Sequence, residues 1–222
     1  MRNYLVLSTF LLLAPLILLS QEVDVSAFEA HLANCSNIYA DSNVAYIDSL
    51  IENSDLSERQ LAHLDIVKGI HFVTMFEDSL AKVNFDKGER YFSISKDTSS
   101  LMYSNYLTGL GLRNRYIGNW PDAKKYFLNS ISIQRAKRAK NLKEFQNSLL
   151  NSTLYGTNLY FLGNIYYYSD IEKEVEPILL EAKDVIEKSQ GVEYGPYESI
   201  LYLLISHYSS LGQIEKTEDV TC

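Results

Sequence analysis

Apolar residues along most of this chain recur at every third or fourth position, which is the spacing of one face of an α-helix. After Asp41, for example, Val44, Ile47, Leu50 and Ile51 share one face. No segment shows the apolar–polar alternation of a half-buried strand. The pattern therefore predicts an all-α fold, with helices at about 43–51, 57–81, 86–94, 99–117, from 119, from 171, 195–211 and from 214.

One abrupt boundary indicates how consecutive helices are arranged. In "GLGLRNRYIGNWPDAKKYFLNSI", Gly118 and Asn119 are suited to the left-handed conformation that ends a helix. Asn119 can also cap the next helix, and Pro121 is tolerated in its first turn, where no backbone N–H is needed. The stretch predicts a tight helix–turn–helix whose apolar faces are turned towards each other.

Two further helix starts have the pattern of a capping box, in which a serine and a residue three positions later satisfy each other's backbone amides. They are "SERQ" at 57–60 and "SDIE" at 169–172.

The chain also repeats itself. Leu110-Gly111 aligns with Leu162-Gly163, and in both copies the aligned position that opens the second helix, Ala123 or Val175, lies twelve positions after the glycine. Two other stretches fit the same frame less closely. The residues that align in them are Phe76, Gly88 and Phe92, and Ile205, Tyr208, Gly212 and Thr217.

These positions resemble the tetratricopeptide repeat family, over roughly residues 40–220 and best over 104–137. The resemblance implies an α-solenoid of antiparallel helix pairs, in about four units with irregular spacing. The alternative is an ordinary helical bundle. About 50 residues separate Ala123 from Val175, and the surplus segment, which begins at Arg135, predicts lengthened helices.

The resemblance also implies a concave groove lined by the first helix of each unit. The side chains that it assigns to the groove combine tyrosines with Asn and Arg donors, which suits an extended peptide. Packing against neighbouring helices is the competing interpretation of these tyrosines. The groove residues are Asn105, Thr108, Leu112, Arg115, Tyr116, Thr157, Tyr160, Asn164, Tyr167, Tyr168 and Tyr202.

The composition agrees with long helices, and the net charge argues against one class of function. The 222 residues include only 4 prolines and 10 glycines, while 46% are hydrophobic and 17 are tyrosine. A net charge of −8 argues against nucleic-acid binding, which needs a basic surface.

The N-terminus has the layout of a secretory signal peptide over residues 1–20. Arg2 precedes an apolar run from Leu5 to Leu19, and Ser20 precedes acidic sequence. We therefore expect an exported protein, periplasmic or extracellular, with a helical-repeat domain at 21–222 whose last unit is incomplete. The alternative is that this segment is not cleaved and anchors the protein; we expect membrane attachment only in that case. Cys35 and Cys222 are expected to be too far apart for a disulfide.

No pattern indicates catalysis, a metal or a cofactor. The four histidines (His31, His63, His71 and His207) lack metal-site spacing, and "TGLGL" lacks the context of a nucleotide-binding loop. The basic run Arg135, Lys137, Arg138, Lys140 and Lys143 is either a docking patch for an acidic partner or anionic surface, or a solvated helix end, which we favour.

We therefore expect a non-enzymatic scaffold of the cell envelope that binds a protein or peptide through the groove. One alternative is the extracytoplasmic input region of a membrane-bound bacterial signalling protein, truncated here. A third hypothesis is an export or envelope-assembly chaperone.

Overall fold

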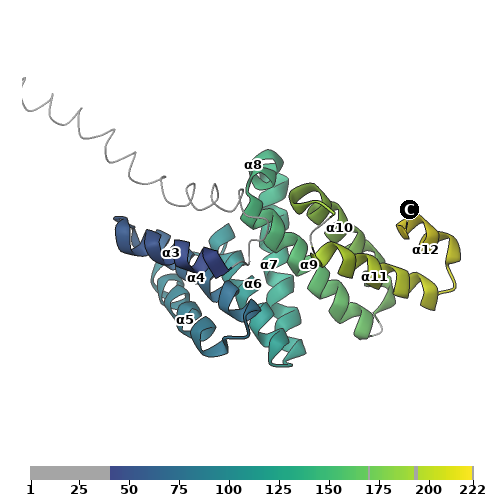
Figure 1. Cartoon of the computed structure of the whole chain (residues 1–222), viewed down its shortest axis with the longest axis horizontal. Helices are drawn as coiled ribbons and strands as arrows, with labels where there is room; N and C mark the ends of the chain where they lie inside the picture. The colour runs from purple at the N-terminus through teal and green to yellow at the C-terminus, as the bar shows by residue number, and fades with distance from the viewer. Residues whose placement is uncertain (1–40, 170, 193–194, 222) are drawn as a thin grey trace, which may run out of the picture.

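The computed structural model describes residues 41–169, 171–192 and 195–221. Predictions about the signal segment, His31, Cys35 and Cys222 lie outside these residues. All regular elements of the described part are helices, which confirms the all-α prediction. With the labels of Figure 1, they are α3 (Asp41–Asn53), α4 (Glu58–Thr74), α5 (Asp78–Ser95), α6 (Leu101–Tyr116), α7 (Trp120–Lys140), α8 (Leu142–Asn147), α9 (Leu149–Tyr168), α10 (Glu172–Gln190), α11 (Gly195–Ser210) and α12 (Ile214–Thr221).

Most of these helices pack in adjacent pairs: α4 with α5, α6 with α7, α9 with α10, and α11 with α12. Successive pairs are joined because the first helix of one pair also contacts the first helix of the next, as α4 does with α6 and α9 with α11. The second helix contacts the following pair too, as α7 does with α9 and α10 with α11. The pairs follow one another along an elongated molecule, from α3 at one end to α12 at the other (Figure 1).

The same short turn closes every pair. Three residues separate the two helices each time, and a backbone N–H at the end of the turn donates to a carbonyl five residues earlier, as in a Schellman motif. These bonds are Glu77 to Phe72 (2.9 Å), Asn119 to Asn114 (2.8 Å), Ile171 to Tyr166 (3.0 Å) and Gln213 to Tyr208 (2.9 Å).

The turn predicted at Gly118 is confirmed. Gly118 has φ +80°, and Pro121 lies in the first turn of α7. Asn119 precedes α7, but its side chain makes no cap. It donates instead to the Asp122 carboxylate at 2.7 Å.

Two predicted boundaries in the first pair were wrong. The helix expected over 57–81 ends at Thr74, and α5 runs without interruption through Asp86, where a new start was expected. The turn is built on Phe76, which has φ +62° although it is not glycine. Because neither Gly nor Pro marks the turn, the sequence pattern continues across it.

Of the two predicted capping boxes, the one at Ser57 is confirmed. The Ser57 side chain accepts from the Gln60 amide, and Gln60 accepts from the Ser57 amide at 2.9 Å. The box at Ser169 was wrong, because the Ser169 amide bonds to Tyr166 and so closes α9. Helix α10 begins later, with Ile171 at its N-cap position and no side-chain cap.

A close contact between a small and a large residue recurs at the centre of three pairs. A Cβ built on Gly111 would lie 2.6 Å from the Phe127 ring, so only glycine lets α6 and α7 approach this closely. Gly163 faces Leu179 in the same way across α9 and α10. The two glycines of these contacts, Gly111 and Gly163, are the ones that the predicted repeat aligned with each other.

The first pair has the same contact, but in a different register from the one expected. Gly69 faces Phe85, and Ala81 is fully buried, twelve residues after the glycine. The expected frame of Phe76, Gly88 and Phe92 lies seven residues later. Seven residues are about two helical turns, so the same face of the helix is presented and the two registers look alike in sequence.

The surplus residues between the second and third pairs lengthen helices, as predicted. Helix α7 has 21 residues and α9 has 20. They also form the six-residue α8, which contacts both α7 and α9 and was not predicted.

A buried polar cluster lies where α6, α7 and α9 meet. The Asn158 amide nitrogen lies 2.8 Å from the Thr108 hydroxyl, 3.0 Å from that of Ser130 and 3.0 Å from the Gln134 carbonyl oxygen. All four side chains are fully buried. One side chain from α9 thus supplies hydrogen bonds to both helices of the preceding pair.

Adjacent pairs are also joined at the surface. The Arg113 guanidinium donates to both carboxylate oxygens of Asp78, at 2.6 and 2.9 Å, and so ties the end of α6 to the start of α5. This hydrogen bonding lowers the pKa of Asp78 and raises that of Arg113.

We predict that Gly111→Ala destabilises the protein by about 1 kcal/mol, because overpacking exceeds the gain of about 1 kcal/mol in helix propensity. Urea denaturation measures this. Gly195→Ala is the control, since a Cβ there meets nothing within 4 Å. Adding Phe127→Leu to Gly111→Ala should cost less than the sum of the single changes, and strict additivity would contradict the contact.

We also predict that Asn158→Ala lowers the free energy of unfolding by about 2–4 kcal/mol, since it leaves buried polar groups without a donor and opens a cavity. Thermal unfolding followed by circular dichroism tests this. The matched control is Asn53→Ala, at an exposed amide that bonds to Ser49 within α3. Equal losses in the two variants would show that the cluster contributes nothing.

Candidate partner-binding surface

An aromatic cluster forms where the turns of the first two pairs approach α9. We define it as Phe76, Tyr116, Trp120 and Phe161, arranged around Arg115. Phe76 and Tyr116 meet edge to face, with ring centroids 5.0 Å apart. The Arg115 guanidinium carbon lies 4.3 Å from the Phe161 ring centroid, 5.7 Å from that of Tyr116 and 5.8 Å from that of Trp120. Five side chains from four segments are thus gathered on one surface.

Phe76 is held in this cluster against the preference of its backbone. Its φ of +62° is in the left-handed region, where a residue with a Cβ is disfavoured by about 1–2 kcal/mol. Glycine occupies the corresponding place in the turns at Gly118 and Gly212. Phe76 nevertheless keeps 76% of its surface exposed. An exposed ring on a strained backbone is the kind of outlier from which a functional hypothesis can start.

Arg115 has unused hydrogen-bonding capacity within the cluster. Within the described part of the chain it forms no ion pair, and its Nε is buried without a hydrogen-bond partner. Three rings hold the planar guanidinium by cation–π contacts, each within 6 Å. A carboxylate or a peptide carbonyl is the natural acceptor for a guanidinium that has no ion pair, although the buried Nε itself is not accessible to a partner.

The structure separates the residues that the sequence assigned to a groove. Asn105, Thr108, Leu112 and Thr157 are at most 4% exposed. Thr108 belongs to the buried polar cluster, and Asn105 bonds to Asn151 at 3.3 Å. Asn105 and Thr108 on α6 are covered by α9, the first helix of the next pair, through Asn151 and Asn158. These predicted groove residues lie inside the fold and are not available to a partner.

Other predicted groove residues do reach the surface. Arg115 and Tyr116 belong to the aromatic cluster, and Tyr160 adjoins it through Phe161, with ring centroids 4.8 Å apart. Further along, the rings of Tyr167 and Tyr168 meet edge to face at the end of α9.

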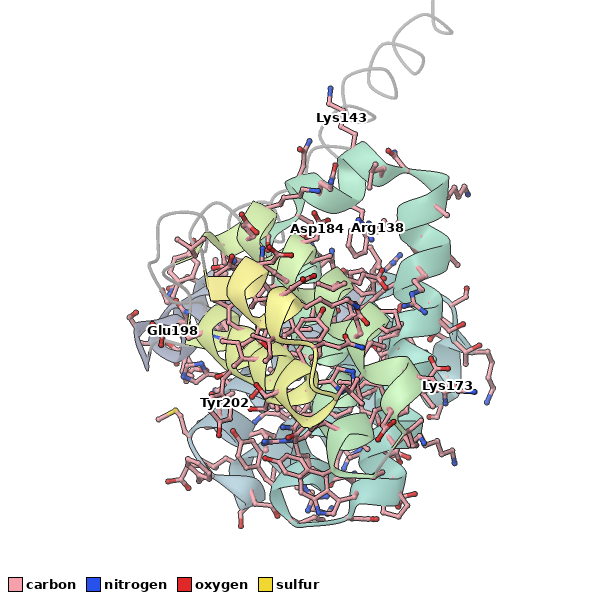
Figure 2. The ribbon with its side chains drawn as sticks, turned by 90° about the vertical axis from the view of Figure 1, so that its right-hand side faces the viewer. Arg138, Lys143, Lys173, Asp184, Glu198 and Tyr202 are labelled. Carbon is pink, nitrogen blue, oxygen red and sulfur yellow. The ribbon has the colours of Figure 1, made fainter. Side chains whose placement is uncertain are left out.

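Asn164 and Tyr202 complete the predicted set. Asn164 is buried, with 9% of its surface exposed, so like Asn105 it is not available to a partner. Tyr202 on α11 is 68% exposed and is labelled in Figure 2. No ring contact joins Tyr202 to the aromatic cluster within the described residues.

Sequence reasoning missed three members of the cluster. Phe76 was treated as a position inside a helix, and Trp120 and Phe161 were not singled out. A useful signal was available for Trp120, the one tryptophan of the chain, because it directly precedes Pro121, which the sequence places in the first turn of a helix. Phe161 lies on α9 one residue after a predicted groove position.

The described residues contain no group of three or more His, Cys, Asp and Glu residues that could hold a metal ion. Burial, assisted by the charge of Arg59, lowers the pKa of His63 to about 4, so its imidazole is neutral at physiological pH.

The helices at 41–221, apart from the few undescribed positions, include none long and apolar enough to span a membrane.

Comparisons with protein-family models, with curated proteins and with solved structures find no match to this chain.

We predict that Phe76→Gly stabilises the protein by about 1 kcal/mol, since glycine adopts positive φ without strain. Chemical denaturation measures the change. The reciprocal control is Gly118→Ala, which should lose about as much, because Gly118 has φ +80° with nothing near its Cβ position. A destabilised Phe76→Gly protein would mean that the ring supports the fold.

Proposed function

We infer that this chain is a non-enzymatic scaffold that binds a protein or peptide partner. Its contact surface is the aromatic cluster, extended along α9 and α11 by Tyr160, Tyr167, Tyr168 and Tyr202. Exposed rings provide apolar contact area with little loss of conformational entropy, and Arg115 provides a directional anchor. The observation that carries the proposal is Phe76, an exposed ring kept on a left-handed backbone.

We also propose that the helix pairs form a solenoid of the tetratricopeptide type. Three pairs share a small residue twelve positions before a buried one and sixteen before a large one, as in Gly111, Ala123 and Phe127. The repeated three-residue turn and the contacts between successive first helices support the same proposal. In such an array the first helices line one face.

Export is a further part of the proposal. It is supported by the signal-peptide pattern of residues 1–20. We place the scaffold in the periplasm or outside the cell, where it would work without a cofactor.

The test is a peptide selection from a displayed library against the full chain, followed by fluorescence anisotropy with the selected peptides. We expect Phe76→Gly and Arg115→Gln each to weaken binding by about tenfold or more, as for central interface residues. Phe76→Gly is the sharper variant, because it should bind more weakly while being more stable, which excludes unfolding as the cause.

Ile94→Ala is the matched control. Ile94 is 78% exposed near the other end of α5, so its removal should leave affinity unchanged. The proposal would be contradicted if the selected peptides bound both cluster variants as tightly as they bind the unchanged chain.

A further inference from the structure

The five cations of segment 135–143 divide into two sets. Arg135 and Arg138 face α10, where both reach the Glu181 carboxylate, with N–O distances of 2.5 and 3.3 Å. Arg135 also donates to the Tyr155 hydroxyl at 3.2 Å, and that hydroxyl donates to Glu181. The two arginines are thus used within the fold.

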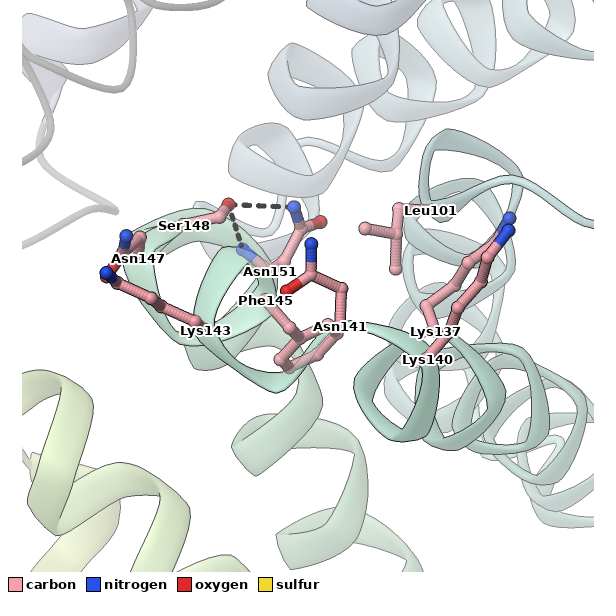
Figure 3. Close-up of a pocket in the computed structure, with 9 residues that line it drawn as sticks. All are labelled: Leu101, Lys137, Lys140, Asn141, Lys143, Phe145, Asn147, Ser148 and Asn151. Carbon is pink, nitrogen blue, oxygen red and sulfur yellow. Dashed lines mark hydrogen bonds between the residues drawn. The ribbon is translucent and has the colours of Figure 1, made fainter.

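The three lysines of the segment, in contrast, have no such role within the fold. Lys137, Lys140 and Lys143 form no ion pair or hydrogen bond within the described part of the chain. They line a pocket of about 850 Å³ between the end of α7, helix α8 and the start of α9. Figure 3 shows Lys137 and Lys140 on one side of the pocket and Lys143 on the other, with Asn141 between them. Lys143 also projects outward at α8 in Figure 2.

This arrangement depends on the break at Asn141. Its φ of −148° and ψ of 84° end α7 and redirect the chain into α8. Lys137 and Lys140, three residues apart, share one face of α7, and the break brings Lys143 to the same pocket. None of the described residues lining the pocket is acidic. An anion bound between these lysines would be attracted by all three positive charges.

The rest of the pocket lining is mostly polar, and hydrogen bonds hold part of it in place. The Asn151 amide donates to Ser148 at 2.7 Å, and its carbonyl oxygen accepts from buried Asn105 at 3.3 Å. Asn141 and Asn147 add further carboxamides to the lining. A carboxamide carries both donors and an acceptor, which is what a peptide backbone requires.

We propose that this pocket binds an acidic segment of a partner polypeptide, with the lysines pairing with its Asp and Glu side chains and the asparagines contacting its backbone. The site is separate from the aromatic cluster. Trp120 and Lys140 are the first and last residues of α7, a helix about 30 Å long. The proposal therefore goes beyond the proposed function and does not depend on it.

Other anionic partners fit less well. Nucleic acids need an extended basic surface, whereas the chain carries a net charge of −8. Single strands also need stacking rings, and Phe145 is the one aromatic residue among the described lining residues and is buried. A flat membrane surface would not enter a concave pocket.

The test measures fluorescence anisotropy of a labelled oligoglutamate peptide with the full chain, at low and at physiological salt. We expect the combined change Lys137→Gln, Lys140→Gln and Lys143→Gln to weaken binding by about tenfold or more. The matched control, Lys96→Gln, Lys125→Gln and Lys173→Gln, removes the same charge elsewhere and should change affinity by less than about twofold. Phe76→Gly should have no effect.

Equal losses in the two triple variants would overturn the proposal, because net charge alone would explain the binding. So would lysine-dependent binding of polyphosphate, a single-stranded oligonucleotide or anionic vesicles that exceeds binding of the peptide. Loss of peptide binding in Phe76→Gly, with none in the lysine variant, would assign the acidic segment to the aromatic cluster instead.

Discussion

The architecture depends on how closely the two helices of each pair can approach. A large side chain of the second helix, such as Phe127, presses directly on the backbone of the first, at a glycine with no side chain to displace. This contact is made at Gly69, Gly111 and Gly163. The turns at Gly118 and Gly212 place glycine at a positive φ, whereas the first turn has Phe76 there. The outer faces of each pair then remain available for packing against the next.

The two ends of the paired helices therefore have different properties. The turns between paired helices lie at one end and display aromatic rings around Arg115. At the other end, the connection from α7 to α9 is long enough to include α8, and lysines gather there. Packing is regular at the centre of each pair, whereas the connections between helices vary. The aromatic cluster and the lysine pocket both lie at such connections.

What the sequence could predict follows from how local each signal is. The capping box at Ser57 and the turn at Gly118 depend on a few neighbouring residues, and both were predicted correctly. The turn at Phe76 has no such signal, so the first repeat was placed two helical turns too late. Burial of Asn105 and Thr108 depends on helices from a neighbouring pair, which helical periodicity cannot reveal. Lys137 and Arg138 are adjacent in sequence, and only the position of α10 separates their environments.

The hydrogen bonds of Asn158 have a consequence for how the protein can vary. Asn158 belongs to the third pair but donates hydrogen bonds to buried side chains of the second pair. Neither pair alone therefore contains all the partners that its buried polar groups need. Removing or duplicating one unit would leave a hydroxyl or an amide stranded in an apolar interior. In an ideal repeat protein, units can be exchanged because each meets its neighbours through equivalent surfaces. Here the second and third pairs share buried hydrogen bonds, so we expect that they can be moved or duplicated only together.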